Sequence, residues 1–358
     1  MSKRVTITQV AAAAGVSIKT VSNVLNDTGN MRPQTRARVR RVMDELGYQV
    51  NLAARTMRTG ATKLLGLGIA DFSQPFSAYL TDNIIQAARA RGYGVVTSTY
   101  GFHHQSAESI LPETHKLPAD GWIFFLGDRA AEDSPIFSQS YPVVFASEFD
   151  AFGKVDSVTM PSYEMTKDVV TRLIRSGKQR IAFAGAPLRS EDESESDYLA
   201  RIDASCFGTV DMRTKGYCDA LRENGRTVDT RVIRDCMFID HKNGAELAAH
   251  LLEDIDAGHL ELPDAIVCAN DAVAFGVIHA LASRGVRIPE DVAIVGFDNV
   301  PEAQYSNPTL TTINPHVDDF ARAAVDFLIE RIEGYKGPVR RYSTTCDLQI
   351  RQSALLEL

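Results

Sequence analysis

The sequence predicts a small all-α domain followed by an α/β body made of two doubly wound parallel-sheet lobes. Residues 11–26, AAAAGVSIKTVSNVLN, have the composition of two short helices joined by a tight turn. Residues 1–60 carry a net charge of +7, whereas the rest of the chain carries −15. From Leu64 onward, short apolar strands alternate with helical segments, which is typical of buried parallel sheets. At 358 residues, the chain is long enough for two or three domains.

The helical domain, residues 1–50, is predicted to be a helix-turn-helix with a supporting third helix. Thr8 can cap a first helix that runs through Val10 to Ala14, and Gly15 suits the left-handed position after it. Ser17 can cap a second helix two residues later, and Pro33 suits the first turn of a third. The apolar stripe of this third helix is Val39, Val42, Met43 and Leu46.

The polar face of the second helix has the residue types that read base pairs in a major groove. There Lys19 can donate to guanine, Asn23 can pair with adenine and Ile18 can touch a thymine methyl group. Hydroxyl and arginine side chains nearby can hold phosphates, which fix register without reading sequence. The DNA-contacting residues predicted in this domain are Thr8, Ser17, Ile18, Lys19, Thr20, Ser22, Asn23 and Arg36. The alternative is a basic three-helix bundle that binds a protein partner.

Three stretches, TITQVAAAAGVSIKTVSNVLN, RPQTRARVRRVMDELGY and NLAARTMRTG, resemble the head of the lactose-repressor (LacI/GalR) family of bacterial transcription regulators. The likeness extends over essentially the whole chain. It implies a ligand-controlled repressor that binds pseudo-palindromic double-stranded operator DNA as a homodimer. Asn23 stands where the family often has arginine, so a different operator sequence is expected. The end of the chain, RQSALLEL, has no appended heptads, which favours a dimer over a tetramer.

The same resemblance implies that residues 51–60 form a hinge helix and linker. A helix this short is marginal in water and would form when docked on DNA beside its twin from a second subunit. Met57, where leucine is usual, would then insert between base steps of the minor groove. Asn51 would lie at the start of this helix, and Arg55 would lie near phosphate. A plain flexible linker is the alternative.

The body contains more predicted strands than one sheet holds comfortably, so two lobes around a cleft are expected, as in periplasmic-binding-protein folds. The expected first lobe comprises residues 61–160 and 314–340, and the second lobe comprises residues 161–313 and 341–358. The predicted strands read LLGLGIA, GVVTSTY, GWIFFL, PVVFA, RIAFAGAP, DAIVCAND and DVAIVGFDN. Residues 188–211 contain the acidic run EDESESD and are expected to be a mobile, solvated loop, with a lid over the cleft as the alternative.

In open α/β sheets, ligands bind beyond the carboxyl ends of the strands. This rule nominates Phe76, Ser77 and Ser147, and also the pairs Asn270–Asp271 and Asp298–Asn299. The resemblance adds Arg213, which leads the segment RTKGY, and an aromatic position at Phe238 or Ile239. The predicted effector-binding residues are therefore Phe76, Ser77, Ser147, Arg213, Phe238, Asn270 and Asp298.

Such a set of donors, acceptors and aromatic rings suits a polyhydroxylated ligand, so a sugar or sugar derivative is the expected effector. A purine-like co-repressor is the alternative. Local roles also stay open, since Asn270 and Asp271 could cap the next helix and Asp298–Asn299 could form a turn.

Other classes of protein fit less well. The segment GLGIAD has Asp71 where a dinucleotide fingerprint needs its third glycine, and no G-x-S-x-G or H-E-x-x-H motif occurs. Catalysis, a cofactor and a metal are therefore not expected. The five cysteines include no C-x-x-C pair, and no apolar run suits a signal peptide or membrane helix. The expected location is the cytoplasm, whereas a secreted sugar-binding protein would need a signal peptide and would lack the basic head.

Overall fold

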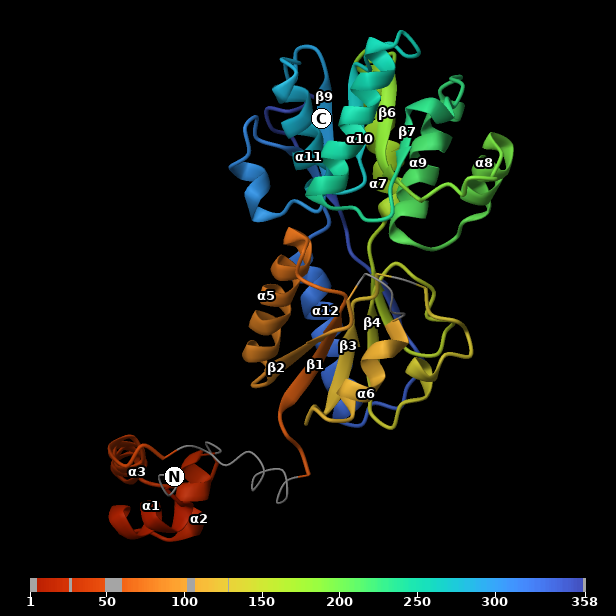
Figure 1. Cartoon of the computed structure of the whole chain (residues 1–358). Helices are drawn as coiled ribbons and strands as arrows, with labels where there is room; N and C mark the ends of the chain where they lie inside the picture. The colour runs from red at the N-terminus through yellow and green to blue at the C-terminus, as the bar shows by residue number, and fades with distance from the viewer. Residues whose placement is uncertain (1–4, 26–27, 49–59, 102–106, 128, 357–358) are drawn as a thin grey trace. The chain divides into compact units, whose positions relative to one another are not determined.

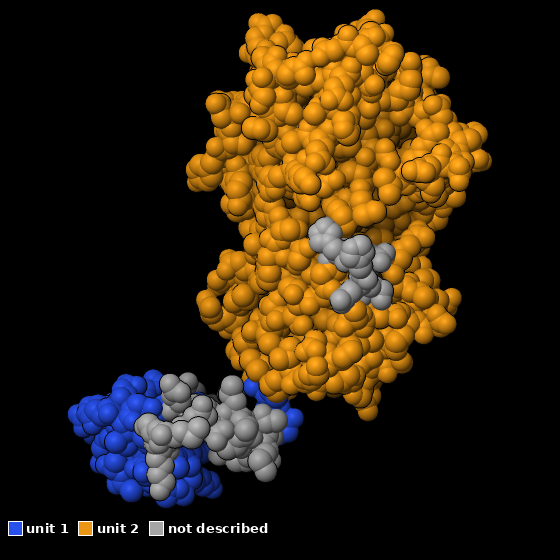
Figure 2. Space-filling view, in the orientation of Figure 1, with its two compact units in different colours: residues 1–62 blue, residues 63–358 orange. Residues whose placement is uncertain are grey.

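The computed structural model describes residues 5–25, 28–48, 60–101, 107–127 and 129–356. The chain divides into two compact units, the head (residues 1–62) and the body (residues 63–358), which Figure 2 colours separately. No helix within the described ranges has the length and apolarity needed to cross a bilayer.

The head is a helix-turn-helix with a supporting helix, as predicted. It consists of α1 (Ile7–Ala14), α2 (Ile18–Leu25) and α3 (Pro33–Glu45). Gly15 has a φ of 60°, in the left-handed region, and so permits the tight turn between α1 and α2. The three helices enclose a small core of Val10, Ala11, Ala14, Val21, Val24, Val39 and Val42.

Two details of the head differ from the prediction. Thr6, not Thr8, caps α1: its Oγ1 accepts the Gln9 N–H while the Gln9 side chain accepts the Thr6 N–H, which forms a capping box. Thr8 instead lies in the first turn and is exposed. At the other end, α3 stops at Glu45, and Leu46 is 39% exposed rather than part of the core.

The body contains two sheets, and together with the head it confirms the predicted fold class (Figure 1). Among the described residues, the first sheet has six parallel strands in the order β11-β5-β4-β3-β1-β2. Helices α5 (Pro75–Ala90) and α12 (Val317–Ile332) pack together on one face, and the short α6 (Leu111–Thr114) lies over the other. The strands are β1 (Leu64–Ile69), β2 (Gly94–Thr99), β3 (Gly121–Phe124), β4 (Val143–Ala146), β5 (Asp156–Thr159) and β11 (Arg341–Ser343).

The second sheet has the order β12-β10-β9-β8-β6-β7 over the described residues, and only its edge strand β12 is antiparallel. One face carries α7 (Ser162–Arg175) and α9 (Thr209–Glu223), and the other carries α10 (His241–Asp256) and α11 (Asp271–Ser283). The strands are β6 (Ile181–Ala186), β7 (Ile233–Asp235), β8 (Ala265–Cys268), β9 (Ala293–Phe297), β10 (Thr311–Asn314) and β12 (Asp347–Gln349). We call the regions built on the two sheets the first and second lobes.

The glycines of β1 serve packing rather than phosphate binding. A Cβ atom on Gly66 would lie 2.2 Å from the Trp122 ring, and one on Gly68 would lie 2.5 Å from the Phe124 ring. These two fully buried rings stack with centroids 5.9 Å apart on the neighbouring strand β3. The sequence GLGIAD therefore makes room for an aromatic layer, which agrees with its failure as a dinucleotide fingerprint.

The chain crosses between the lobes three times, after β5, after β10 and after β11 (Figure 1). The third crossing differs from the expected lobe boundary. The expected boundary places residues 341–343 in the second lobe, but they form β11, which pairs with β5 in the first sheet. A strand of three residues is too short to be recognised from its sequence pattern.

The acidic segment 188–211 is also different from the expected mobile loop, because it contains the helix α8 (Glu195–Ala204). Ser194 caps this helix by accepting the Asp197 N–H. Tyr198 is 2% exposed and Ile202 is fully buried. Glu195 and Asp197 are exposed in the first turn of this helix, whereas Glu193 precedes it and forms an ion pair with Arg201.

A buried ion cluster fastens β11 to the first lobe. Asp156 is 1% exposed and accepts hydrogen bonds from Arg331 and Arg340, at 2.8–2.9 Å for their guanidinium groups. The backbone N–H of Arg340 donates to the same carboxylate. Burial acts to raise the pKa of Asp156, but these hydrogen bonds outweigh it and hold the pKa below its ordinary value.

We predict that Asp156→Asn lowers the free energy of unfolding by about 3–5 kcal/mol, because it leaves two arginines without their buried partner. The contribution of Asp156 should be present above pH 4 and be lost as the pH falls through its lowered pKa. Urea unfolding at pH 7 and at pH 3 would measure both effects. Asp168→Asn, which removes a partly exposed pair with Arg172, is the control and should cost less than about 1 kcal/mol. An equal cost at the two positions would contradict this account.

Candidate functional site

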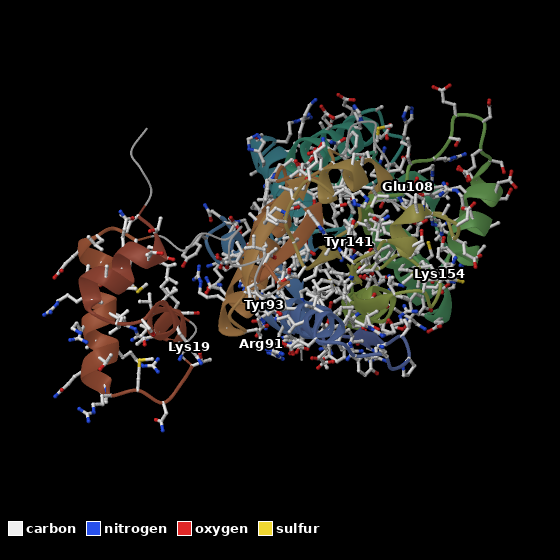
Figure 3. All side chains as sticks on the ribbon, turned by 90° about the horizontal axis from the view of Figure 1, so that it is seen from below. Lys19, Arg91, Tyr93, Glu108, Tyr141 and Lys154 are labelled. Carbon is white, nitrogen blue, oxygen red and sulfur yellow. The ribbon has the colours of Figure 1, made fainter. Side chains whose placement is uncertain are left out.

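The second helix of the head exposes its N-terminal residues. Ile18 is 47% exposed, and Lys19, labelled in Figure 3, is also exposed. Ser17 begins the helix as predicted, because its Oγ accepts the Thr20 N–H at 3.1 Å and lies 2.9 Å from the Thr20 hydroxyl oxygen. An apolar side chain beside a lysine at an exposed helix start is suitable for contact with base edges.

The other predicted DNA contacts have varied surroundings. Asn23 is half-buried beside Gly29, and the φ of 79° at Gly29 favours a glycine there. Thr8 is exposed, whereas Ser22 and Arg36 are half-buried. The predicted hinge contacts Asn51, Arg55 and Met57 lie outside the described residues.

In the body, a cavity of about 140 Å³ lies between the two lobes. All seven residues predicted to bind an effector line it, although they come from distant parts of the chain. They are Phe76, Ser77, Ser147, Arg213, Phe238, Asn270 and Asp298, and the alternative aromatic position Ile239 lines it as well. This volume is comparable with that of one small ring.

Arg213, on α9, is the buried cation of this cavity, with 3% of its surface exposed. Its Nε donates to Ser162 Oγ at 3.1 Å, and its Nη1 donates to the Ala269 carbonyl at 2.5 Å. Its guanidinium carbon lies 3.5 Å from the centroid of the Phe297 ring. The guanidinium plane is therefore fixed before any ligand enters.

Two carboxylates share this guanidinium. Arg213 Nη2 donates to Glu148 Oε1 at 3.3 Å, and Arg213 Nη1 lies 3.7 Å from Asp298 Oδ1. Burial raises the pKa of Glu148 and that of Asp298, although the charge of Arg213 opposes both shifts. Glu148 belongs to the first lobe, whereas Arg213 and Asp298 belong to the second, so this cluster also joins the lobes.

Asp298 has an unusual backbone conformation for a residue with a side chain. Its φ is 119°, and Asn299 after it has a φ of 50°. Such conformations cost about 1–3 kcal/mol and tend to occur at binding and catalytic sites. The chain bends at Asp298, and this strained acidic residue lines the cavity.

Asn270 has a local role as well as a place in the cavity. It caps α11 by accepting the Val273 N–H at 2.9 Å, and its amide donates to the Ile239 carbonyl at 2.9 Å. The same amide lies 3.4 Å from the Gln74 side-chain oxygen, which comes from the first lobe. The local alternative for Asn270 is thus correct, and it places the residue at a second contact between the lobes.

Asp271 does not line the cavity and does not cap α11. It is fully buried, accepts the Thr312 hydroxyl at 2.5 Å and accepts the Val300 N–H at 2.9 Å. Burial raises the pKa of Asp271 to about 7. These bonds fasten α11 to β10 and to the turn after β9, which holds Asp298 in place.

The remaining wall is apolar or already hydrogen-bonded. The Phe76 and Phe125 rings lie 5.5 Å apart at one side of the cavity. The Ser147 hydroxyl donates to the Leu126 carbonyl at 3.5 Å and accepts the Phe149 N–H at 3.1 Å, so this serine organises a turn. The sequence analysis missed Glu148 and Gln74, although the carboxyl-end rule that nominated Ser147 could have been extended by one residue to Glu148.

Comparison with known proteins identifies the family. Residues 6–51 match the model of bacterial regulatory proteins of the lacI family, and residues 170–354 match a periplasmic-binding-protein-like domain. The catabolite control protein A of Priestia megaterium is 31% identical over 326 residues, which cover 90% of this chain and 91% of that protein. This chain belongs to the lacI family of transcription regulators.

Solved structures of other lacI-family regulators have the same fold. A LacI-type transcription regulator from Bifidobacterium animalis subsp. lactis is 42% identical, with a TM-score of 0.74, over 81% of this chain and 99% of that one. The transcriptional regulator CelR, in a complex with cellobiose, is 25% identical, with a TM-score of 0.65, over 98% of this chain and all of that one.

We predict that Arg213→Met destabilises this lacI-family regulator more at pH 8 than at pH 5. Without the guanidinium, the raised pKa values of Glu148 and Asp298 rise further, so the folded state retains protons that the unfolded state releases as the pH increases. The expected loss at pH 8 is about 3–5 kcal/mol, and at pH 5 it should be smaller by at least about 1.4 kcal/mol. Urea unfolding of both proteins at the two pH values measures this.

Arg222→Met is the matched control, because Arg222 lies on the same helix but makes partly exposed ion pairs with Asp203 and Asp219. Its cost should stay below about 1 kcal/mol at both pH values. A loss for Arg213→Met that does not depend on pH would show that the two carboxylates do not titrate with the guanidinium.

Proposed function

We propose that this chain is a repressor whose affinity for operator DNA is controlled by a small carbohydrate in the cavity between the lobes. The observation that carries the proposal is the Arg213–Glu148–Asp298 cluster, which combines a fixed donor, two acceptors and a contact between lobes. A homodimer would present two heads to the half-sites of a pseudo-palindromic operator.

The head would read DNA through the start of α2. Lys19 is the donor to guanine, Asn23 is the partner of adenine and Ile18 is the contact for a thymine methyl group. Thr8, Ser17, Thr20, Ser22 and Arg36 would hold phosphates. The hinge residues Asn51 and Arg55 would lie on the minor groove with Met57 inserted between base steps.

The cavity suits a neutral molecule with many hydroxyl groups. Glu148 and Asp298 accept hydrogen bonds, Arg213 donates them, and the paired Phe76 and Phe125 rings can cover an apolar sugar face. The complex of the relative CelR with cellobiose supports a carbohydrate. The regulators that the chain resembles support a regulatory role rather than catalysis.

The same contacts explain how a ligand would act at a distance. A hydroxyl that binds Glu148 competes with Arg213, and one that binds Asn270 competes with Gln74. Each exchange alters a bond between the lobes, and hence the relative position of the strands that lead to the two hinges of a dimer. By linkage, a sugar that weakens DNA binding must itself be bound less tightly by the DNA-bound form.

We predict that Lys19→Ala weakens binding to operator-like DNA about 10- to 100-fold, because one good base contact contributes about 1–3 kcal/mol of discrimination. Gel-shift titration at fixed salt concentration measures the change. Lys242→Ala, at an exposed lysine of the body, should leave DNA binding within twofold. Equal effects of the two substitutions would indicate that only the overall charge matters.

A second prediction concerns the ligand response. Asp298→Ala should abolish the effect of an active sugar on the gel shift while leaving operator affinity without ligand within about threefold. A thermal-shift screen of sugars and nucleobases would first identify the active compound. An unchanged response in the variant would remove Asp298 from the site, and a nucleobase as the active compound would replace the carbohydrate assignment.

A further inference from the structure

The cavity between the lobes adjoins a second space of about 570 Å³, which is more open to solvent. The two spaces share five lining residues, namely Gly127, Phe149, Val210, Cys236 and Met237. Residues of both lobes are in this shared wall, so a ligand that leaves the inner cavity on this side enters the outer chamber directly. We refer to the two spaces as the inner cavity and the outer chamber.

The segment 188–211 builds the far wall of the outer chamber. Leu188, Arg201, Ala204 and Ser205 line it, together with Asp211 on the first turn of α9. Leu188 is 50% exposed, so part of its apolar side chain is accessible at this wall. Of residues 188–211, only Thr209 and Val210 line the inner cavity.

This wall is held rigidly. The Tyr198 hydroxyl donates to the Pro187 carbonyl at 3.1 Å, and Arg201 forms two hydrogen bonds with Glu193 at 2.8 and 3.0 Å. Lys215 of α9 donates to the carbonyls of Asp203 and Ser205. The chamber is therefore preformed, which reduces the entropy cost of binding.

The segment also connects with the acidic side of the inner cavity. The N–H of Gly208 donates to the Glu148 carbonyl at 3.0 Å, so the wall of the outer chamber is tied to the residue that binds Arg213. The inner cavity has one guanidinium, Arg213, beside the two carboxyl groups of Glu148 and Asp298. It therefore has no excess positive charge, which disfavours an anionic ligand.

The outer chamber combines the two kinds of surface that bind a sugar ring. Phe149, Leu188 and Met237 provide apolar faces, and Met237 is 66% exposed. Arg201 and Asp211 provide polar groups at the edge. A second ring attached to a first one in the inner cavity would contact both kinds of surface.

We propose that the effector is a neutral disaccharide or longer glycoside, with one ring in the inner cavity and the next ring in the outer chamber against the segment 188–211. This assignment rests on the proposed carbohydrate response. The segment 188–211 thereby selects the length of the sugar, whereas the Arg213 cluster selects its first ring.

The test compares single sugars with their two-ring derivatives on the full-length protein. Isothermal titration with glucose, galactose, mannose and xylose, each beside disaccharides that contain it, should find a disaccharide bound at least tenfold more tightly than its component sugars. Ala204→Trp, at the exposed end of α8, should fill the chamber and weaken that disaccharide at least tenfold, while a component sugar changes less than twofold.

Ala200→Trp, at an exposed position one turn earlier on α8 that does not line the chamber, should leave both affinities unchanged. Leu188→Ala, which cannot block the chamber, should weaken only the disaccharide. If a single sugar binds as tightly as any disaccharide, or if Ala204→Trp weakens both equally, the two-ring assignment is wrong while the carbohydrate response stands. If no sugar binds, both the proposed carbohydrate response and this assignment are wrong.

Discussion

The body depends on one buried cation at the boundary between its lobes. A buried guanidinium is stable only when it is neutralised and fully hydrogen-bonded, and Arg213 obtains these partners from both lobes. Ser162 and Ala269 come from the second lobe, whereas Glu148 must be brought to it by the first. The electrostatic requirement of a single side chain therefore couples the separation of the lobes to the chemistry of the cavity. A ligand that supplies other partners to Arg213 or Glu148 would weaken the interaction that holds the lobes together.

The head must fold while leaving the residues at the start of α2 exposed to solvent. Among the described residues, the buried part of its core consists of valines and alanines, which allows three short helices to pack closely. A core of this size contributes little to the free energy of folding. The hydrogen bonds of the helix caps therefore make up a larger share of the stability of the head. Thr6 with Gln9 and Ser17 with Thr20 provide hydrogen bonds at two helix starts without burying a polar group. Lys19 and Ile18 can thus remain exposed at no cost to the core.

Much of this architecture could be predicted because the strands are continuous apolar runs, and their order fixes which loops meet. Arg213, Asn270 and Asp298 are far apart in sequence, yet strand ends and family resemblance together placed them at one cavity. The failures have physical causes. The strand β11 is too short to show a period, and α8 was missed because its many acidic residues outweigh Tyr198 and Ile202 in composition. Glu148 lies just beyond a strand end, but no sequence pattern shows which of the residues there will supply a second carboxylate to a buried arginine.

The structure also shows why local and functional explanations of a polar residue need not compete. Asn270 caps α11 and lines the cavity, and Asp298 lies in a strained turn and lines it too. A cap or a turn fixes the side chain in one orientation, which lowers the entropy that a ligand must remove on binding. Asn270 donates to Gln74 and Arg213 donates to Glu148, so a ligand that binds these groups under the proposed function would have to replace contacts between the lobes. In the proposed function, ligand binding and separation of the lobes would therefore be coupled, because both depend on the same few contacts.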